Sequence, residues 1–213
     1  VQRQLGGLII RDKTSLRALR KSLKAKRRLI KGSEREVKSA LITRNLLCYL
    51  AFMRCRSFAI YLSLWDEVAT QGLIKHGEQL EKKIYLPVIN TKKWLNQGMI
   101  FAPYVSGKTK FQINRYGITE PVAKLNECVR GTEIEFVCVP IVGFNDRCDR
   151  IGMGGGYYDR AFHQRQFQRS KLVGLAFSDQ QADFRPSRHD VPMHAVITED
   201  CIIERKAHGS ITA

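Results

Sequence analysis

Several features that would place this chain in other protein classes are missing from its 213 residues. No apolar run approaches the roughly 20 residues that a membrane-spanning helix needs, so no membrane segment is expected. The first residues, Val1–Leu5, are not followed by a continuous apolar segment with a small-residue cleavage site, so no secretory signal is expected either. These absences predict a cytoplasmic protein, although a basic, amphipathic start is also compatible with a transit peptide.

Metal-binding and disulfide motifs are missing as well. The six cysteines contain no Cys-x-x-Cys pair, and the five histidines contain no His-Glu-x-x-His motif. A structural zinc site is therefore not expected. The cysteines lie mainly in apolar segments such as 136–139, which indicates buried, reduced thiols.

Acidic residues are scarce: 20 Asp and Glu stand against 36 Lys and Arg, for a net charge of +16. Residues 1–31 carry eleven of these cations and a single acid, Asp12. Such a block is typical of nucleic-acid-binding proteins, but a positive cleft also attracts phosphates and carboxylates. No recognised nucleic-acid motif accompanies the charge, and the cations do not interleave with aromatic residues. A nucleic-acid-binding module is therefore the main alternative to an enzyme that handles an anionic small molecule.

The hydrophobic pattern predicts an α/β protein. Apolar residues at helical spacing predict a helix over 13–31, and Ser33-x-x-Glu36 predicts a capping box that opens a second helix over 34–53. Beyond it, apolar strand candidates alternate with helical patterns. The strands are expected at 58–62, 84–89, 99–101, 133–144, 172–177 and 195–197, the helices at 66–80 and 157–168, and a loop-rich stretch at 103–131. This order predicts one domain over 1–213, with a mostly parallel open sheet covered by helices on both faces and two leading helices.

The segment Asp149–Arg160 is the most informative part of the chain. It follows the strand candidate 133–144, opens a helix, and holds four glycines among the five residues 152–156. Glycine lets backbone N–H groups approach an anion, and a helix start adds further donors, so the loop suits a di- or triphosphate. Arg150 offers a planar fork for phosphate oxygens, and Asp159 a carboxylate for magnesium shared with the phosphates. The glycines alone are equally compatible with an ordinary turn, and they match neither the P-loop nor the dinucleotide motif.

This segment resembles the signature Arg-Leu-Gly-x-Gly-x-Gly-Tyr-Tyr-Asp of the 5-formyltetrahydrofolate cyclo-ligase (5,10-methenyltetrahydrofolate synthetase) family. Further motifs resemble that family in the same order along residues 10–200. They are Lys13-x-x-x-Arg17, the stretch Leu62–Glu67, Tyr116–Pro121, Gly174–Phe177 with Gln180, and His189–Pro192.

The resemblance implies an ATP- and Mg²⁺-dependent ligase that closes 5-formyltetrahydrofolate to 5,10-methenyltetrahydrofolate by phosphorylating the formyl oxygen, and that releases ADP and phosphate. It implies catalytic roles for Arg150 and Lys13 and a magnesium ligand in Asp159. The implied nucleotide-binding residues are Lys13, Arg17, Arg150, Ile151, Gly152, Met153, Gly154, Gly155, Gly156, Tyr157, Tyr158 and Asp190. The implied folate-binding residues are Leu62, Glu67, Met153, Gly154, Gly155, Gly156 and Tyr157. A monomer that binds small molecules, including polyglutamated folate, and neither nucleic acid nor membrane is expected; a different ATP or sugar-phosphate enzyme on the same sheet is the second alternative.

The chain departs from the family pattern just before the glycine loop. The usual Phe-Asp-x-x-Gly reads here as residues 144–148, with Asn145 at the Asp position and Cys148 at the Gly position. A shifted turn is expected to let Asp146 replace the missing carboxylate.

The basic N-terminal helix is expected to divide into two parts. Lys13 and Arg17, four residues apart on one helical face, are expected to contact the nucleotide. The cluster 24–28 is expected to face solvent or the glutamate tail of the folate.

Overall fold

The protein is built on one central sheet, as the sequence predicts. The computed structural model describes residues 13–89, 98–163 and 170–206, and only the backbone of residues 13 and 14. Seven strands form the main sheet in the order β11-β10-β9-β6-β1-β2-β3, with parallel pairing from β10 to β2 and antiparallel pairing at both edges. These strands are β1 (Ser57–Ala59), β2 (Lys83–Ile89), β3 (Met99–Tyr104), β6 (Phe136–Pro140), β9 (Lys171–Leu175), β10 (Ala195–Ile197) and β11 (Ile202–Glu204). Two small hairpins accompany the sheet: β4 (Phe111–Ile113) with β5 (Thr119–Pro121), and β7 (Gly143–Phe144) with β8 (Arg150–Ile151).

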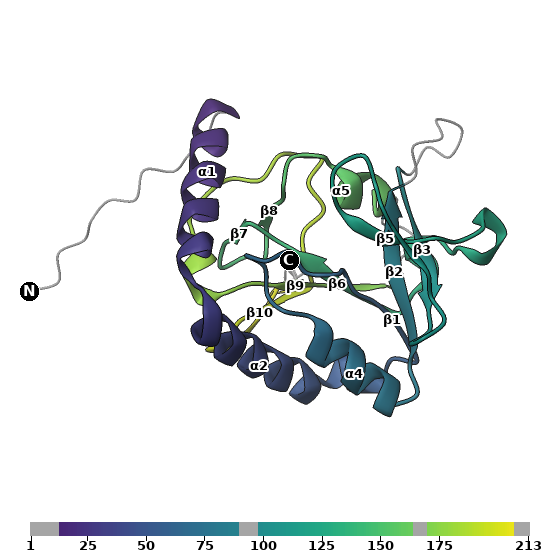
Figure 1. The fold of residues 1–213 in the computed structure, drawn as a ribbon. Helices are drawn as coiled ribbons and strands as arrows, with labels where there is room; N and C mark the ends of the chain where they lie inside the picture. The colour runs from purple at the N-terminus through teal and green to yellow at the C-terminus, as the bar shows by residue number, and fades with distance from the viewer. Residues whose placement is uncertain (1–12, 90–97, 164–169, 207–213) are drawn as a thin grey trace, which may run out of the picture.

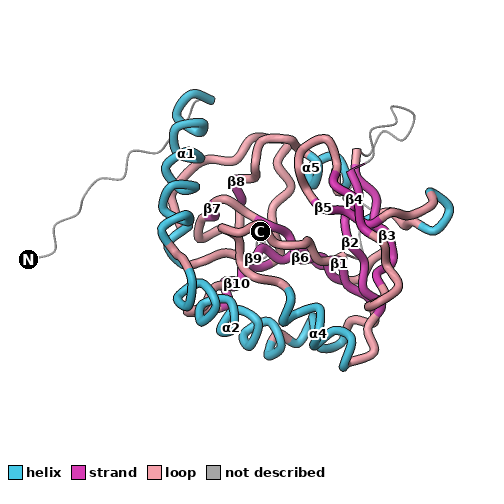
Figure 2. Tube along the Cα trace, in the orientation of Figure 1, coloured by secondary structure: helices cyan, strands magenta, loops and turns pink. Residues whose placement is uncertain are grey.

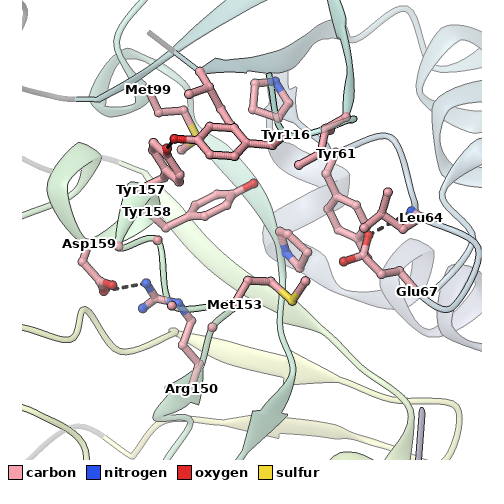
Figure 3. A pocket seen from close by; sticks show the side chains of 18 of the residues that line it. Tyr61, Leu64, Glu67, Met99, Tyr116, Arg150, Met153, Tyr157, Tyr158 and Asp159 are labelled. Carbon is pink, nitrogen blue, oxygen red and sulfur yellow. Dashed lines mark hydrogen bonds and ion pairs between the residues drawn. The ribbon is translucent and has the colours of Figure 1, made fainter. Parts of the chain in front are cut away.

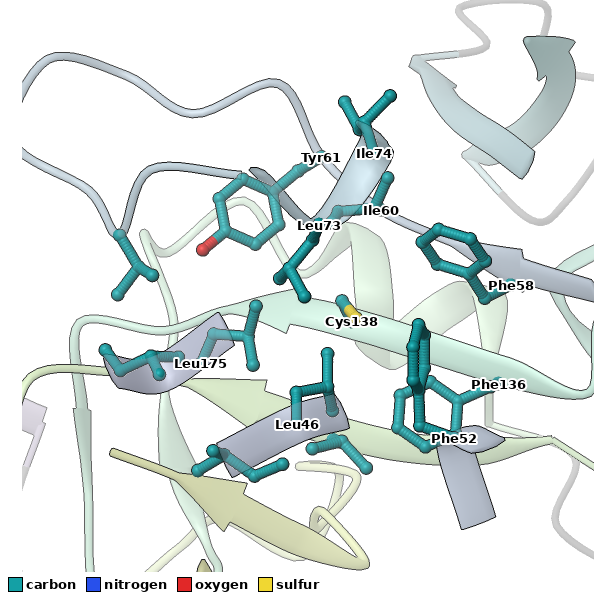
Figure 4. Close-up of a cluster of buried hydrophobic side chains, with 14 of the residues drawn as sticks. Leu46, Phe52, Phe58, Ile60, Tyr61, Leu73, Ile74, Phe136, Cys138 and Leu175 are labelled. Carbon is teal, nitrogen blue, oxygen red and sulfur yellow. The ribbon is translucent and has the colours of Figure 1, made fainter. Parts of the chain in front are cut away.

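Helices flank the sheet, and two of them lead the chain (Figure 1). Alternate residues of the buried strands point to opposite faces: Phe136 and Cys138 pack into one cluster, and Val137 and Val139 into the other. The first cluster also takes side chains from α2, α3 and α4, and the second takes side chains from α5 (Figure 4). The α-helices are α1 (Lys13–Leu29), α2 (Gly32–Cys48), α3 (Leu50–Arg54), α4 (Gln71–Gln79) and α5 (Tyr157–Ala161); short 3-10 turns lie at Leu125–Glu127, Gly131–Glu133 and Ser178–Gln180. The predicted mostly parallel sheet with helices on both faces is confirmed.

The strand order places a switch point between β1 and β6. The chain passes from β1 to β2 on one side, and later returns to add β6 on the other side of β1. In open α/β sheets, ligands bind at the carboxyl ends of the strands where the order reverses. The residues that follow β1 and β6 are therefore the first place to look for a site.

Several local predictions are wrong. The capping box at Ser33 does not form, because α2 begins at Gly32 after Lys31, which caps it with no side-chain hydrogen bond. The second helix is interrupted at Tyr49, which has an extended backbone. The helix predicted over 66–80 begins only at Gln71, so residues 60–70 form mostly irregular backbone (Figure 2). The helix predicted over 157–168 ends at Ala161, and residues 164–169 lie outside the described part.

The cysteines are free thiols, and Cys55, Cys138 and Cys148 are buried as expected, whereas Cys48 and Cys201 are exposed. Within the ranges that the structure describes, no helix is both long and apolar enough to cross a membrane.

Candidate active site

One cavity of about 760 Å³ lies at the switch point. Tyr61 and Leu62, which follow β1, and Pro140, the last residue of β6, line its floor. The glycine loop, the β4–β5 hairpin, α1, parts of β2 and β3, the loop that carries Glu67 and residues 184–185 supply further walls. In Figure 3, Arg150 and Asp159 lie on one side of the pocket and Glu67 on the opposite side. The cavity therefore has a cationic, glycine-lined end and a carboxylate end.

The glycine loop presents an accessible backbone. Gly154 and Gly156 have φ values of 101° and 63°, a left-handed conformation that side chains with a Cβ rarely adopt. Both lie in the pocket wall with Gly155 between them. The helix α5 that follows has only five residues, so its dipole is short, and an anion here depends mainly on backbone N–H groups and nearby cations.

Arg150 is fixed by contacts inside the protein. Its side chain is 5% exposed; Nη1 donates to the Val191 carbonyl, and Nη2 lies 2.5 Å from Asp159 Oδ1. The Val191 backbone N–H also donates to Asp159 Oδ1, at 3.0 Å. Arg150, β8, α5 and the segment before Val191 are thus held together at the cationic end of the pocket.

Asp159 and Asp190 both line this end. Burial, and then the nearby negative charge of Asp159, raise the pKa of Asp190, although a hydrogen bond from the Ser187 N–H opposes the rise. Two carboxylates with substrate phosphates are a usual magnesium environment, so these residues fit that ion. Among the described residues, no group of three or more His, Cys, Asp or Glu side chains converges on a metal site of its own.

Glu67 is the carboxylate at the opposite end. It is 6% exposed, and its Oε2 accepts a hydrogen bond of 3.0 Å from the Leu64 N–H. Burial raises the pKa of the Glu67 carboxyl above its ordinary value. The pKa of Tyr61 and that of Tyr158 are also raised, by burial and then by the Glu67 charge, so both phenols lie in the field of this carboxylate. Glu67 is therefore a buried acceptor in a largely apolar, aromatic wall.

The β4–β5 hairpin closes one side of the pocket. Glu120 at its base is buried and accepts hydrogen bonds from the Ile89 N–H and from Asn114 Nδ2, at 3.1 and 2.9 Å. At its tip, the Tyr116 hydroxyl lies 2.6 Å from the Tyr157 hydroxyl at the start of α5 (Figure 3). The hairpin is thus tied to β2 at its base and to the glycine loop at its tip.

The turn before Arg150 corrects one expectation. Asn145 itself forms the turn: its Oδ1 accepts the N–H groups of Arg147 and Asp149, both at 3.0 Å, while Asp146 is exposed. Asp146 therefore does not replace the missing carboxylate. Cys148, at the position where the family pattern has glycine, has a left-handed backbone with φ at 58°, a conformation that glycine adopts most easily.

The N-terminal helix differs from the expectation in two ways. Arg17 is exposed and does not line the cavity, whereas Arg20, one turn later, lines it and donates from Nε to the Gly152 carbonyl at 2.8 Å. The side chain of Lys13 lies outside the described residues. Arg27 was expected at solvent or at a glutamate tail, but it is 2% exposed and paired with Asp66.

The pocket thus gathers all the other predicted site residues. They are Leu62, Glu67, Arg150, Ile151, Gly152, Met153, Gly154, Gly155, Gly156, Tyr157, Tyr158, Asp159 and Asp190. Sequence reasoning missed Arg20, Tyr61 and Met99 among the lining residues. Arg20 carries no signal of its own within a run of cations, but Tyr61 directly precedes the predicted Leu62 in the same strand candidate. The individual roles of all these residues stay predictions.

Comparisons with known proteins point to one family. The model of the 5-formyltetrahydrofolate cyclo-ligase family matches residues 12–199. The 5-formyltetrahydrofolate cyclo-ligase of Haemophilus influenzae is 31% identical over 73% of this chain and 82% of its own length. The Escherichia coli K12 protein of the same name is 26% identical over 85% and 99%. In structure, the chain resembles the Aquifex aeolicus 5,10-methenyltetrahydrofolate synthetase, with a TM-score of 0.76, 27% identity, and coverage of 93% of this chain and 96% of the other.

Proposed function

Because the chain belongs to the 5-formyltetrahydrofolate cyclo-ligase family, we propose that it closes 5-formyltetrahydrofolate to 5,10-methenyltetrahydrofolate in an ATP- and Mg²⁺-dependent reaction that releases ADP and phosphate. One observation carries this proposal: a single cavity joins a glycine loop with a fixed arginine at one end to a buried carboxylate at the other. A phosphate donor and a pterin need these two environments side by side.

The cationic end suits the triphosphate. The accessible backbone of residues 152–156 offers N–H donors, and Arg20 and Arg150 add positive charge beside it. Phosphoryl transfer depends on positioning and on neutralising charge, more than on covalent help from the protein. We assign Lys13 and Arg17 to the nucleotide as well, on the family resemblance alone.

Asp159 and Asp190 would hold magnesium at this end. Bound by these two carboxylates, magnesium would supply positive charge beside the phosphates during transfer. Asp159 already accepts from Arg150 through Oδ1, so the same carboxylate would couple the arginine fork to the phosphates.

The carboxylate end suits the folate. Glu67 can accept two neighbouring N–H donors of the amino-pyrimidine, an arrangement that favours a carboxylate. Leu62, Met153 and Tyr157 supply apolar and aromatic surface around it. The formyl group then lies between the two ends, where its oxygen can receive the γ-phosphoryl group. The neighbouring folate nitrogen attacks the formyl carbon and releases its proton as the new C–N bond forms, and phosphate leaves in place of hydroxide.

The proposal extends to a monomeric enzyme that accepts polyglutamated folate. The exposed cations of α1 would attract such a tail, since exposed positive charge steers carboxylates toward a cleft.

The test is direct detection of methenyltetrahydrofolate by its absorbance, with 5-formyltetrahydrofolate and with ATP and magnesium each omitted in turn. We expect product only when all three are present, with ADP and phosphate released in equal amounts. Product without ATP would overturn the proposed energy source, and no product from the folded protein would overturn the activity.

A further inference from the structure

Arg27 is a buried cation directly behind the pocket wall. It does not line the pocket itself, but it lies beside Glu67, which does. It belongs to the last turn of α1 and is 2% exposed. Its Nε and Nη2 donate to Asp66 Oδ2 at 3.2 and 2.9 Å, and its Nη1 donates to the Ile141 carbonyl at 3.4 Å. A buried guanidinium needs such partners, because an unpaired charge away from water is costly.

The same guanidinium faces Glu67. Arg27 Nη1 lies 3.7 Å from Glu67 Oε1, while the other carboxylate oxygen, Oε2, accepts the Leu64 N–H. A second arginine, Arg35 of α2, holds the backbone of this loop by donating to the carbonyls of Leu64 and Glu67 at 3.1 and 2.7 Å. The loop is therefore fixed by Arg35, and the carboxylate that it carries is fixed by Arg27.

Five titratable or charged groups from four elements interact electrostatically with Glu67. Arg27 and Arg35 come from α1 and α2, Asp66 is its neighbour in the loop, Tyr61 follows β1, and Tyr158 belongs to α5. Burial raises the pKa of Glu67; Arg27 and Arg35 oppose that rise, and Asp66 adds to it. Arg27 and Asp66 thus form one ion pair whose two members shift the pKa of Glu67 in opposite directions.

We propose that Arg27 is a positioning residue for folate recognition: anchored on Asp66 and the Ile141 carbonyl, it orients the Glu67 carboxylate toward the pocket and stabilises its negative charge for the amino-pyrimidine edge of the substrate. This inference rests on the proposed function of Glu67. A merely structural ion pair would hold α1 to the loop and would leave the pH dependence of folate binding unchanged.

Two substitutions distinguish a positioning role from a structural one. Both break the Arg27–Asp66 pair, but they change the charge beside Glu67 in opposite directions. Arg27→Met removes the positive charge beside Glu67, and we expect the acid limb of folate binding to move up by about one pH unit. The KM for the folate then rises by about tenfold at a pH below that limb, and by much less above it. Asp66→Asn removes the negative neighbour, so the acid limb is expected to move down. The KM for ATP should stay unchanged in both variants.

The direct measurement is a carbon-13 carboxyl titration of glutamate-labelled protein, with the Glu67 signal assigned by its loss in Glu67→Gln. This readout does not depend on activity. Opposite shifts in the two variants support the proposal; shifts in one direction, or none, overturn it. If Arg27→Met does not fold, Arg27→Lys keeps a charge without the fork and should give a smaller upward shift beside the same Asp66→Asn result.

Failure of the proposed function would look different. Wild-type protein would then form no methenyltetrahydrofolate, or Glu67→Gln would bind folate as well as wild type does. In either case the titration of Glu67 still reports whether Arg27 controls it.

Discussion

At the scale of single residues, Arg150 is a structural clamp as well as a phosphate candidate. Its fork is committed to Val191 and Asp159. We therefore expect Arg150→Ala to lower turnover by about two orders of magnitude and also to cost about 1–3 kcal/mol of unfolding free energy. Steady-state kinetics and urea unfolding measure the two effects. Arg185, an exposed arginine in the same pocket wall, is the matched control, and Arg185→Ala should leave stability within about 0.5 kcal/mol. An Arg150→Ala protein with wild-type stability would contradict the clamp.

The ionised Glu67 side chain is expected to lower the stability of the fold while it contributes to folate binding. Its pKa is raised by burial, so folding disfavours its ionised form, and this penalty appears as the pH rises from the unfolded pKa through the folded one. Glu67→Gln keeps an oxygen for the Leu64 N–H but carries no charge. We expect the variant to be more stable than wild type at pH 7, to lose this advantage toward pH 4, and to bind folate poorly at both. Thermal unfolding across that range tests the sign, and a variant that is less stable at pH 7 than at pH 4, relative to wild type, would contradict it.

At position 148, glycine is expected to give a more stable protein than alanine, the reverse of their order inside helices and strands. The backbone of Cys148 is left-handed, which costs a residue with a Cβ about 1–2 kcal/mol, and its buried thiol donates to the Ile203 carbonyl at 3.3 Å. Cys148→Ala loses the thiol and keeps the strain, whereas Cys148→Gly loses both. We therefore expect the glycine variant to be more stable than the alanine variant by about 1 kcal/mol in urea unfolding. The opposite order would mean that this turn carries no backbone strain.

At the scale of elements, the sequence predicted the strands that are determined by the pattern of their own residues. The strands at 84–89 and 195–197 were placed to within one residue, because short continuous apolar runs favour inner strands of a sheet that is covered on both faces. The first turn predicted for α4 failed, because residues 66–70 are held by partners outside the predicted helix: Asp66 by Arg27, and Thr70 by the Tyr61 carbonyl. The same difference between local and long-range causes decides which site residues could be predicted. The glycine loop is visible in one segment, whereas the contributions of Arg20 and Arg27 depend on where α1 packs.

The β4–β5 hairpin provides a prediction at this scale. Its tip is joined to α5 by the hydroxyl groups of Tyr116 and Tyr157. We expect Tyr116→Phe and Tyr157→Phe each to accelerate amide hydrogen exchange over residues 111–121. The double variant should add little to Tyr116→Phe, because that change already removes both the Tyr157 contact and the hydrogen bond from Arg115 Nη2. Tyr104→Phe is the control, since it keeps the ring that packs 6.4 Å from Phe111. Additive effects would show that the two hydroxyl groups act separately.

At the scale of the whole molecule, the net charge of +16 is expected to destabilise the fold by electrostatic repulsion, which salt weakens. Several cations of α1, including Lys21 and Lys26, are exposed. Screening weakens repulsion between exposed charges, so we expect the melting temperature to rise as NaCl increases from about 0.05 to 0.5 M. A Lys21→Gln/Lys26→Gln variant should show a smaller rise. Equal salt responses would mean that the excess charge is too dispersed along the chain for α1 to matter.

The way the cavity is assembled has a consequence for the protein during its synthesis. Leu16 and Asp190 line the same pocket, although nearly the whole described chain separates them. A growing polypeptide therefore holds no complete binding site until Asp190 has left the ribosome. A ligand of this pocket therefore cannot assist the early, co-translational stages of folding, and any rescue of unstable variants by such a ligand must take place after Asp190 has emerged.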